Sequence, residues 1–392
     1  MRSNWLKLSS VCLMGIFLTG CWDSVEINER HVVLEMAIDK NPEVDHNRQD
    51  RIKKNYQVTY TIPDIGKLSG EDSLAEKVKM AMVTKSSTIA TSLDEIEMKT
   101  QNTITFSHTK ALILGEEILK DKQLFKAAMD GLMRDMQIGR GTSVLAVQGL
   151  AQQLVQVENP QNPILGLYIM KYFNNAERPT SYAKQQTIGN LTKELQNSGI
   201  TTIPVAHIVS QQGKKGEEEG IEISGAAVIK NYELVGWLSK EEVRGKLFVE
   251  GKIKRVPIVV EYNGEYLTYN IETEQSKLKF QNTNGEWAAN LDIRVKGNIT
   301  EYISSFDKQI FSKEDIQNAA EILQREIDRQ IKVAIDRSKE MNIDFLNIGL
   351  EMYRQHPKVW EEYKQNWEQT GYKSFTIHTN TKVTIQNTGI LE

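Results

Sequence analysis

The chain is divided near its middle by ten consecutive residues without an apolar side chain, Gln211-Gln212-Gly213-Lys214-Lys215-Gly216-Glu217-Glu218-Glu219-Gly220. Glycine and charged residues in such a run are typical of an exposed loop or hinge. At 392 residues the chain is also longer than a single domain of usual size. We therefore expect an N-terminal region at 21–210, a hinge at 211–220 and a C-terminal domain at 221–392.

The region before this hinge mixes strands with helices. Apolar patterning predicts strands at 31–39, 56–62, 110–114, 142–147 and 203–209, and helices at 87–99, 124–136, 150–157, 164–174 and 184–196. The alternation from 103 to 157 predicts a mixed α/β layer. Pro160 and Pro163 interrupt the pattern, which favours a subdivision of this region near 158–163.

The region after the hinge is richer in strands, which we predict at 221–230, 234–238, 245–251, 256–262, 266–273, 278–282, 288–298 and 374–385. Asn263-Gly264 is a tight-turn signal between two of them. Ser312 opens a capping-box-like start to a long helix with an apolar stripe at Ile316, Ala320, Leu323, Ile327, Ile331 and Ala334. The expected fold class is α+β, with a mixed α/β N-terminal region followed by a C-terminal antiparallel sheet packed with long helices.

The first twenty residues have the pattern of a targeting signal rather than of folded structure. Arg2 and Lys7 precede or flank a short apolar run at 8–18 that is too short to span a bilayer. The run ends at Leu18-Thr19-Gly20-Cys21, which resembles a bacterial lipobox. The resemblance implies signal peptidase II cleavage between Gly20 and Cys21, removal of 1–20, and N-acyl and S-diacylglycerol groups on Cys21. The alternative is an ordinary secretory signal that happens to contain a cysteine.

Composition excludes several functions. The chain has 48 basic and 52 acidic side chains, and removal of 1–20 leaves 46 against 52, a net charge of −6. This balance argues against a nucleic-acid-binding protein. The cysteines are Cys12 and Cys21, so a mature chain acylated at Cys21 has no disulfide, no cysteine metal site and no cysteine nucleophile. After Cys21 no apolar stretch approaches the roughly 20 residues of a membrane span.

No arrangement of residues predicts catalysis, a cofactor or a metal. Ser107, His108 and Lys110 could in principle support nucleophile chemistry, but no nucleophile elbow accompanies them. We interpret His108 as a histidine bonded to backbone at the start of a strand. Gly139-Arg140-Gly141-Thr142-Ser143 precedes a strand, whereas phosphate loops follow one, so we interpret it as a connecting loop. We expect a protein that is not an enzyme.

Several stretches together resemble the Ger(x)C family of spore germination lipoproteins. They are Gly20-Cys21-Trp22-Asp23, the segment 107–116 that ends in Gly115-Glu116, Arg134-Asp135, the segment 224–239, Asp344-Phe345-Leu346-Asn347-Ile348-Gly349, Trp360 and Trp367. The sequence departs from the family pattern at Ile229, where phenylalanine is common. The resemblance extends from the lipobox to the end of the chain, and its strength lies in the order and spacing of the motifs.

The resemblance implies the C subunit of a nutrient germinant receptor, required for receptor assembly or signalling in spore germination. It also implies a lipid-anchored protein on the outer face of the spore inner membrane, beside A-type and B-type integral-membrane subunits. The family has a multi-domain α+β fold and no known enzymatic activity. The alternative is a substrate-binding lipoprotein of a nutrient importer, and direct binding of a small molecule is left open by the sequence.

Overall fold

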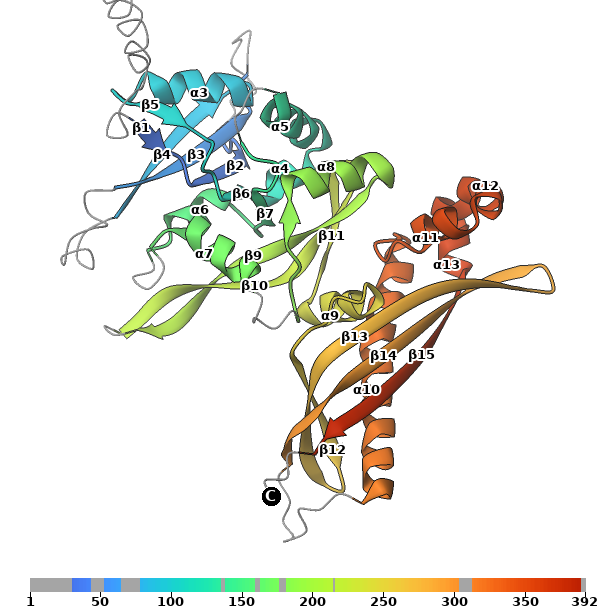
Figure 1. Ribbon diagram of the computed structural model, residues 1–392. Coiled ribbons are helices and arrows are strands. Elements are labelled where there is room, and N and C mark those ends of the chain that lie inside the picture. Colours follow the sequence, from blue (N-terminus) through green and yellow to red (C-terminus); the bar gives the residue numbers. More distant parts are fainter. Residues whose placement is uncertain are drawn as a thin grey trace, which may run out of the picture.

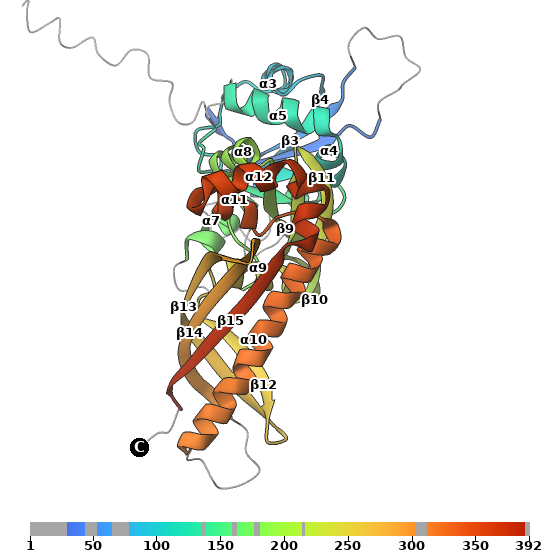
Figure 2. The ribbon, with the colours of Figure 1, turned by 90° about the vertical axis from the view of Figure 1, so that its right-hand side faces the viewer.

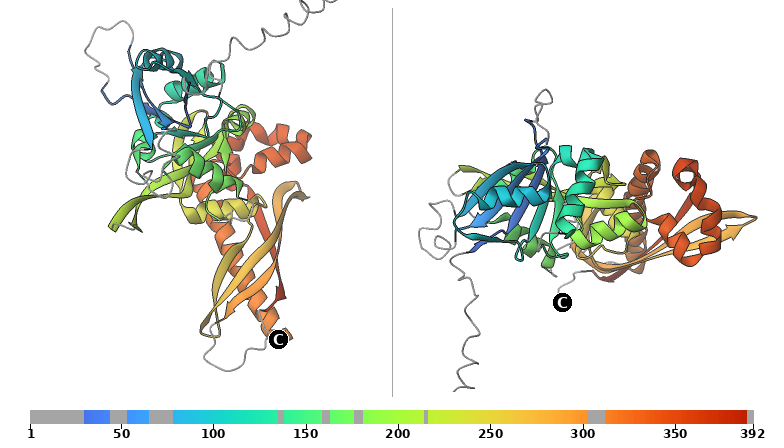
Figure 3. Two further views of the ribbon diagram at one scale, coloured as in Figure 1. Left: turned by 60° about the vertical axis from the view of Figure 1, so that its left-hand side comes forward. Right: turned by 90° about the horizontal axis from the view of Figure 1, so that it is seen from above.

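Two bodies follow one another along the long axis of the molecule (Figures 1 and 3). The computed structural model describes residues 30–43, 53–64, 78–134, 138–158, 163–175, 181–213, 216–302 and 312–388. The predicted signal peptide, Gly20 and Cys21, Asp135 and the residues 159–162 lie outside these ranges. The predictions made for them are therefore not tested by the structure.

The first body is built on a nine-stranded sheet in the order β11-β10-β9-β7-β6-β2-β3-β4, with β8 paired to β7. The strands are β2 (Glu35–Lys40), β3 (Tyr56–Pro63), β4 (Lys79–Ser86), β6 (Ala111–Leu114), β7 (Ser143–Ala146), β8 (Gln186–Thr187), β9 (Ile200–Gly213), β10 (Gly216–Lys230) and β11 (Glu233–Leu238). The four central strands β2, β6, β7 and β9 run parallel, and the outer ones are antiparallel. A separate parallel pair joins β1 (Arg30–Val32) to β5 (Thr103–Thr105).

Helices cover both faces of this sheet (Figure 1). Met36 and Ile38 contribute to a core that includes α3 (Ile89–Glu97), α4 (Glu116–Lys120), α5 (Lys122–Arg134) and α8 (Ile188–Asn197), whereas Ala37 joins a core with α6 (Ala151–Gln156) and α7 (Leu165–Asn174). Successive side chains of a strand point to opposite faces. This alternation confirms the mixed α/β layer.

The second body is a four-stranded sheet in the order β12-β13-β14-β15, with helices along one face (Figure 2). Its elements are α9 (Lys240–Val249), β12 (Val256–Tyr262), β13 (Glu265–Thr283), β14 (Glu286–Tyr302), α10 (Lys313–Met341), α11 (Ile348–Gln355), α12 (Pro357–Asn366), the π-helix η2 (Trp367–Gly371), α13 (Tyr372–Ser374) and β15 (Thr376–Asn387). This arrangement confirms the α+β fold class.

One pairing of this sheet corrects the expected antiparallel order. β15 pairs with β14 in parallel, with Ala288 opposite Thr376. After β14, the 29-residue helix α10 runs back along the sheet. The helices α11 and α12 then lead from the end of α10 toward β15. Because the long helix brings the chain back to the end of the sheet where β14 begins, β15 runs in the same direction as β14.

Local signals for turns and caps are confirmed. The Ser312 hydroxyl accepts from the Asp315 amide at 3.1 Å, and the Asp315 carboxylate accepts from the Ser312 amide at 2.9 Å. Asn263 and Gly264 both adopt the positive φ that a tight hairpin turn requires. The stripe on α10 is buried at Leu323, Ile327, Ile331 and Ala334, while Ile316 and Ala320 are only partly buried.

Two predictions differ from the structure. The strand predicted at 245–251 is mostly helix α9, which begins at a capping box between Ser239 and Glu242. Within the expected hinge, residues 211–213 and 216–220 are not an irregular linker, because they extend the antiparallel pair β9 and β10, with Gly213 opposite Gly216. Backbone pairing gives these polar residues a regular partner although they bury little apolar surface.

Candidate functional site

The strand β10 belongs to the cores of both bodies. Ala227 and Ile229 pack in the core of the first body, and Ala226 and Val228 pack in the core of the second. Successive side chains of this strand point to opposite faces, so one face of β10 packs against the first body and the other face against the second. The junction is a shared strand, and it lies directly after the point where the sequence predicts a hinge.

Gly225 allows this strand to change course. Its φ is +78°, the register of the β9–β10 pair shifts between Ile223 and Ala226, and its amide donates to the Tyr182 carbonyl at 3.0 Å. A Cβ atom on Gly225 would lie 2.6 Å from the Leu238 carbonyl oxygen. A side chain is therefore excluded by both conformation and space.

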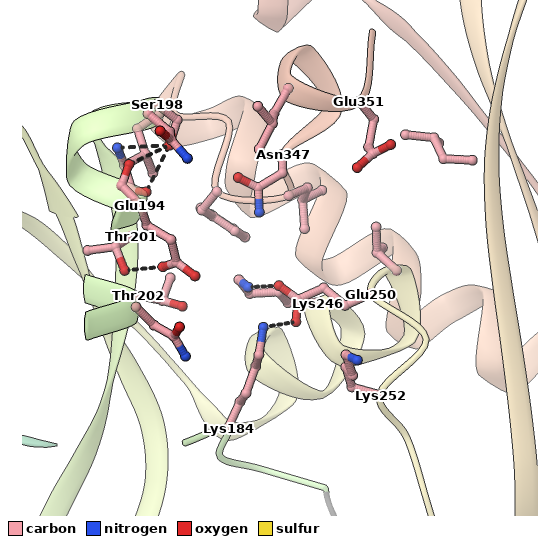
Figure 4. A pocket seen from close by; sticks show the side chains of 18 of the residues that line it. Lys184, Glu194, Ser198, Thr201, Thr202, Lys246, Glu250, Lys252, Asn347 and Glu351 are labelled. Carbon is pink, nitrogen blue, oxygen red and sulfur yellow. Dashed lines mark hydrogen bonds and ion pairs between the residues drawn. The ribbon is translucent and has the colours of Figure 1, made fainter. Parts of the chain in front are cut away.

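A polar cleft of about 660 Å³ lies between α8 and β9 of the first body and α9 and α11 of the second (Figure 4). Asn347, Leu350 and Arg354 line this cleft and also line an adjoining hollow of about 610 Å³. The second hollow is more aromatic, with Tyr353, Trp360, Trp367 and Tyr372 in its wall. Both hollows follow the line along which the two bodies face each other.

An ion triad joins the two walls of the cleft, with Lys246 buried, Glu250 nearly buried and Lys184 exposed. Glu250, which caps the C-terminal end of α9, accepts from Lys184 of the first body at 2.9 Å, and it also pairs with Lys246 one helical turn earlier (Figure 4). Burial alone would raise the pKa of Glu250, but the two ammonium groups overcome it and lower the pKa to about 2. The carboxylate is therefore charged at neutral pH, and the triad links the bodies.

A second polar network lies on the wall formed by the first body. The Gln186 side chain donates to Glu194 at 2.8 Å and to Thr201 at 2.7 Å, and Thr201 in turn donates to Glu194. These three side chains satisfy one another's hydrogen bonds. The network connects β8, α8 and β9 within the first body.

A buried carboxylate organises the aromatic hollow. Asp344 accepts from the Ile348 amide at 2.9 Å, from the Gly349 amide at 2.6 Å and from the Trp367 indole at 3.2 Å. Burial raises the pKa of Asp344 to about 6 in spite of these donors. A Cβ atom on Gly349 would lie 2.7 Å from the Trp360 ring, so the glycine lets the tryptophans close over the start of α11.

Asp344→Ala is expected to destabilise the protein by about 3 kcal/mol, because it leaves two amides and one indole N–H buried without an acceptor. Asp344→Asn keeps an acceptor oxygen in nearly the same volume and should cost clearly less. Urea unfolding of both variants, followed by tryptophan fluorescence, measures the difference. Equal losses in the two variants would contradict this role of the acceptor.

The segment 107–116 is positioned by contacts with the first core. Ser107 and His108 are exposed in a turn before β6, and the Ser107 hydroxyl bonds to the Thr105 hydroxyl at 3.1 Å. Gly115 faces the Asp39 carboxylate, where a Cβ atom would lie 2.0 Å from an oxygen. The His108 side chain is thus at the surface, and the backbone-bonded interpretation is not supported by any hydrogen bond of its ring among the described residues.

Other residues considered from the sequence have structural places. Residues 139–142 form a turn that leads into β7 at Ser143, which confirms the interpretation of this segment as a connecting loop. The described part of the chain contains no group of three or more histidine, cysteine, aspartate or glutamate side chains placed to hold a metal. Sequence reasoning missed Glu250, and it named Asp344 only as part of a family motif and not as a buried acceptor; the apolar residues around each acid were the available signal.

None of the helices in the described ranges combines the length and the apolar composition that crossing a membrane requires. The cleft, the shared strand and the two buried carboxylates all lie at the junction of the bodies. The segments that the sequence analysis singled out, 224–239 and 344–349, build this junction.

Comparisons with known proteins agree on one family. A model described as "Spore germination protein N-terminal domain" matches residues 23–208, and one described as "Spore germination B3/GerAC like, C-terminal" matches residues 224–389. The two matches together cover most of the chain. The first match ends within β9 and the second begins within β10.

Relatives in Bacillus subtilis (strain 168) match over nearly their full length. Spore germination protein B3 is 25% identical over 93% of this chain and 92% of its own. Spore germination protein KC is 21% identical over 96% of this chain and 94% of its own. A crystal structure of the GerBC protein matches with a TM-score of 0.59 at 19% identity, covering 90% of this chain and 97% of the other, which shows a shared fold.

Proposed function

Because this chain belongs to the Ger(x)C family of spore germination proteins, we propose that it is the lipid-anchored C subunit of a nutrient germinant receptor. The observation that carries the proposal is the position of the first family region, which begins at residue 23, two residues after the lipobox cysteine. Cleavage before Cys21 would leave an acylated residue followed almost at once by the family region. The mature chain would lie on the outer face of the spore inner membrane.

In this proposal the protein acts by docking and not by catalysis. The partners are the A-type and B-type integral-membrane subunits, and the acyl groups raise the effective concentration of the protein beside them. The shared strand β10 and the triad at Glu250 hold the two bodies in one arrangement, which supports a role in receptor assembly or signalling.

Cys21→Ala is expected to leave the fold intact and to abolish nutrient germination, because the protein would no longer be concentrated at the membrane. Spores that carry this variant in place of the wild type should stay dormant in the nutrient while non-nutrient triggers still work. Labelled palmitate should be incorporated by the wild type alone. Full nutrient germination of the variant, in spores without a paralogue, would refute the anchored role.

The polar cleft keeps one alternative open, a substrate-binding lipoprotein of a nutrient importer. Such proteins bind their ligand between two similar lobes, whereas here a three-layer body faces a sheet covered on one face. Calorimetry with amino acids, sugars and nucleosides on the full mature chain distinguishes the two. Micromolar binding by the chain alone, without membrane subunits, would favour the alternative.

A further inference from the structure

The four-stranded sheet of the second body has one covered and one open face. α9 and α10 pack on the covered face, and their apolar side chains join those of the sheet in one core (Figure 2). On the open face, β13, β14 and β15 present alternate side chains that are polar or charged along the stretch 273–283, 286–296 and 376–386. We call this part of the open face the sheet platform.

Five exposed cations lie on the sheet platform, and they are Lys277, Lys279, Arg294, Lys296 and Lys382. Pairing brings them together, because Arg294 lies directly opposite Lys382 on the neighbouring strand. Asp292 lies among these cations and pairs with Lys279 at 3.4 Å, and Glu286 is a second acid of the platform, at the hairpin end of β14. The platform therefore carries a net positive charge in a mature chain whose formal charge is −6.

The arrangement of these charges is unfavourable for the isolated protein. Like charges directly opposite each other on one face of a sheet destabilise the pairing. The Asn380 side chain donates to Asp292 at 3.1 Å, and this hydrogen bond, together with Lys279 and Arg294, lowers the pKa of Asp292. Asp292 is thus held charged, and the five cations still outnumber the two acids of the platform, Asp292 and Glu286, by three.

We propose that the sheet platform docks on a lipid surface of anionic headgroups. Protein interfaces have a core of aromatic and apolar side chains, whereas the platform offers lysine, arginine, amide and hydroxyl groups around Asp292. A cationic surface without apolar anchors fits a layer of anionic headgroups, which attracts each nearby basic residue independently. The inference concerns the chain's own surface and is independent of acylation at Cys21.

The test uses the mature chain from residue 21 with Cys21→Ala, so that no acyl group contributes to binding. It is sedimented with vesicles of equimolar phosphatidylglycerol and phosphatidylcholine, and with vesicles of phosphatidylcholine alone. We expect binding to the anionic vesicles only, weakened by salt. Arg294→Gln, Lys296→Gln and Lys382→Gln together should weaken it by on the order of 100-fold, since each charge near the surface contributes a similar factor.

A matched control removes the same charge elsewhere. Lys313, Arg325 and Lys332 are exposed on α10, which packs on the covered face of the sheet, so their triple glutamine variant should bind like the parent. Thermal unfolding of both variants verifies that they fold. Equal weakening in the two variants, or equal binding to neutral vesicles, overturns the proposal because binding would then follow net charge or nonspecific adsorption.

A single label locates the contact. With Cys21 replaced, the mature chain contains no cysteine, so Thr384→Cys on the platform and Gln317→Cys on α10 can each carry one polarity-sensitive dye. Only the dye at position 384 should change its emission with anionic vesicles. If no vesicle binds but the platform variant loses germination, the platform contacts an acidic protein and the lipid proposal is wrong, while the proposed receptor function stands.

Discussion

Gly245→Ala is expected to destabilise the second body by about 3 kcal/mol, although alanine is the better helix former. Gly245 lies where α9 crosses α10, and a Cβ atom there would lie 2.2 Å from the Gln330 carbonyl oxygen and 2.8 Å from the Ala334 Cβ. Neither atom can rotate away, because one is backbone and the other is fixed to it. The helices must separate, and the core between them loses contacts.

Gly131→Ala in α5 is the matched control. Its added Cβ would contact Ile89 at 3.4 Å, an ordinary packing distance, so the variant should be neutral or gain up to about 1 kcal/mol from helix propensity. Urea unfolding of both variants gives the two changes in the free energy of unfolding. A Gly245→Ala protein as stable as the wild type would show that α9 and α10 can separate freely.

Glu250→Gln should be the most pH-sensitive change at the junction. The pKa of Glu250 is lowered from 4.5 to about 2 in the folded protein, so its carboxylate stabilises the fold above about pH 4.5 and stops doing so as pH falls toward 2. At pH 7 the free energy of unfolding of the variant should be lower by about 3 kcal/mol. The stabilisation that accompanies the lowered pKa is lost, and Lys246 stays buried without its acid. Near pH 3 the difference in the free energy of unfolding between variant and wild type should fall to about half of its value at pH 7.

Unfolding in urea at a series of pH values between 7 and 3 measures this narrowing. Glu351→Gln is the control, because Glu351 lies in the same cleft but pairs with Arg354 at an exposed position. Exposed ion pairs contribute less than about 1 kcal/mol. A constant difference between wild type and Glu250→Gln across the series would mean that the triad is not what lowers this pKa.

Local patterns predicted the elements whose stability is decided within a few residues. The stripe at Leu323, Ile327 and Ile331 predicted α10, and Ser312 predicted where it begins, because a helix cap needs only the next three residues. The same approach failed at 245–251, where apolar residues are too few to separate a strand from a helix. The capping box at Ser239, which starts α9, is the local signal that indicates a helix there.

By itself, the sequence determined the fold class, the order of most elements and the family, because periodicity, turn residues and motif order are properties of neighbouring positions. Only the tertiary structure decided that β15 runs parallel to β14, that β10 serves two cores, and that Lys184 meets Glu250 across the cleft. These features depend on which distant segments become neighbours. That choice is made by the joint packing of whole faces, and no local pattern carries it.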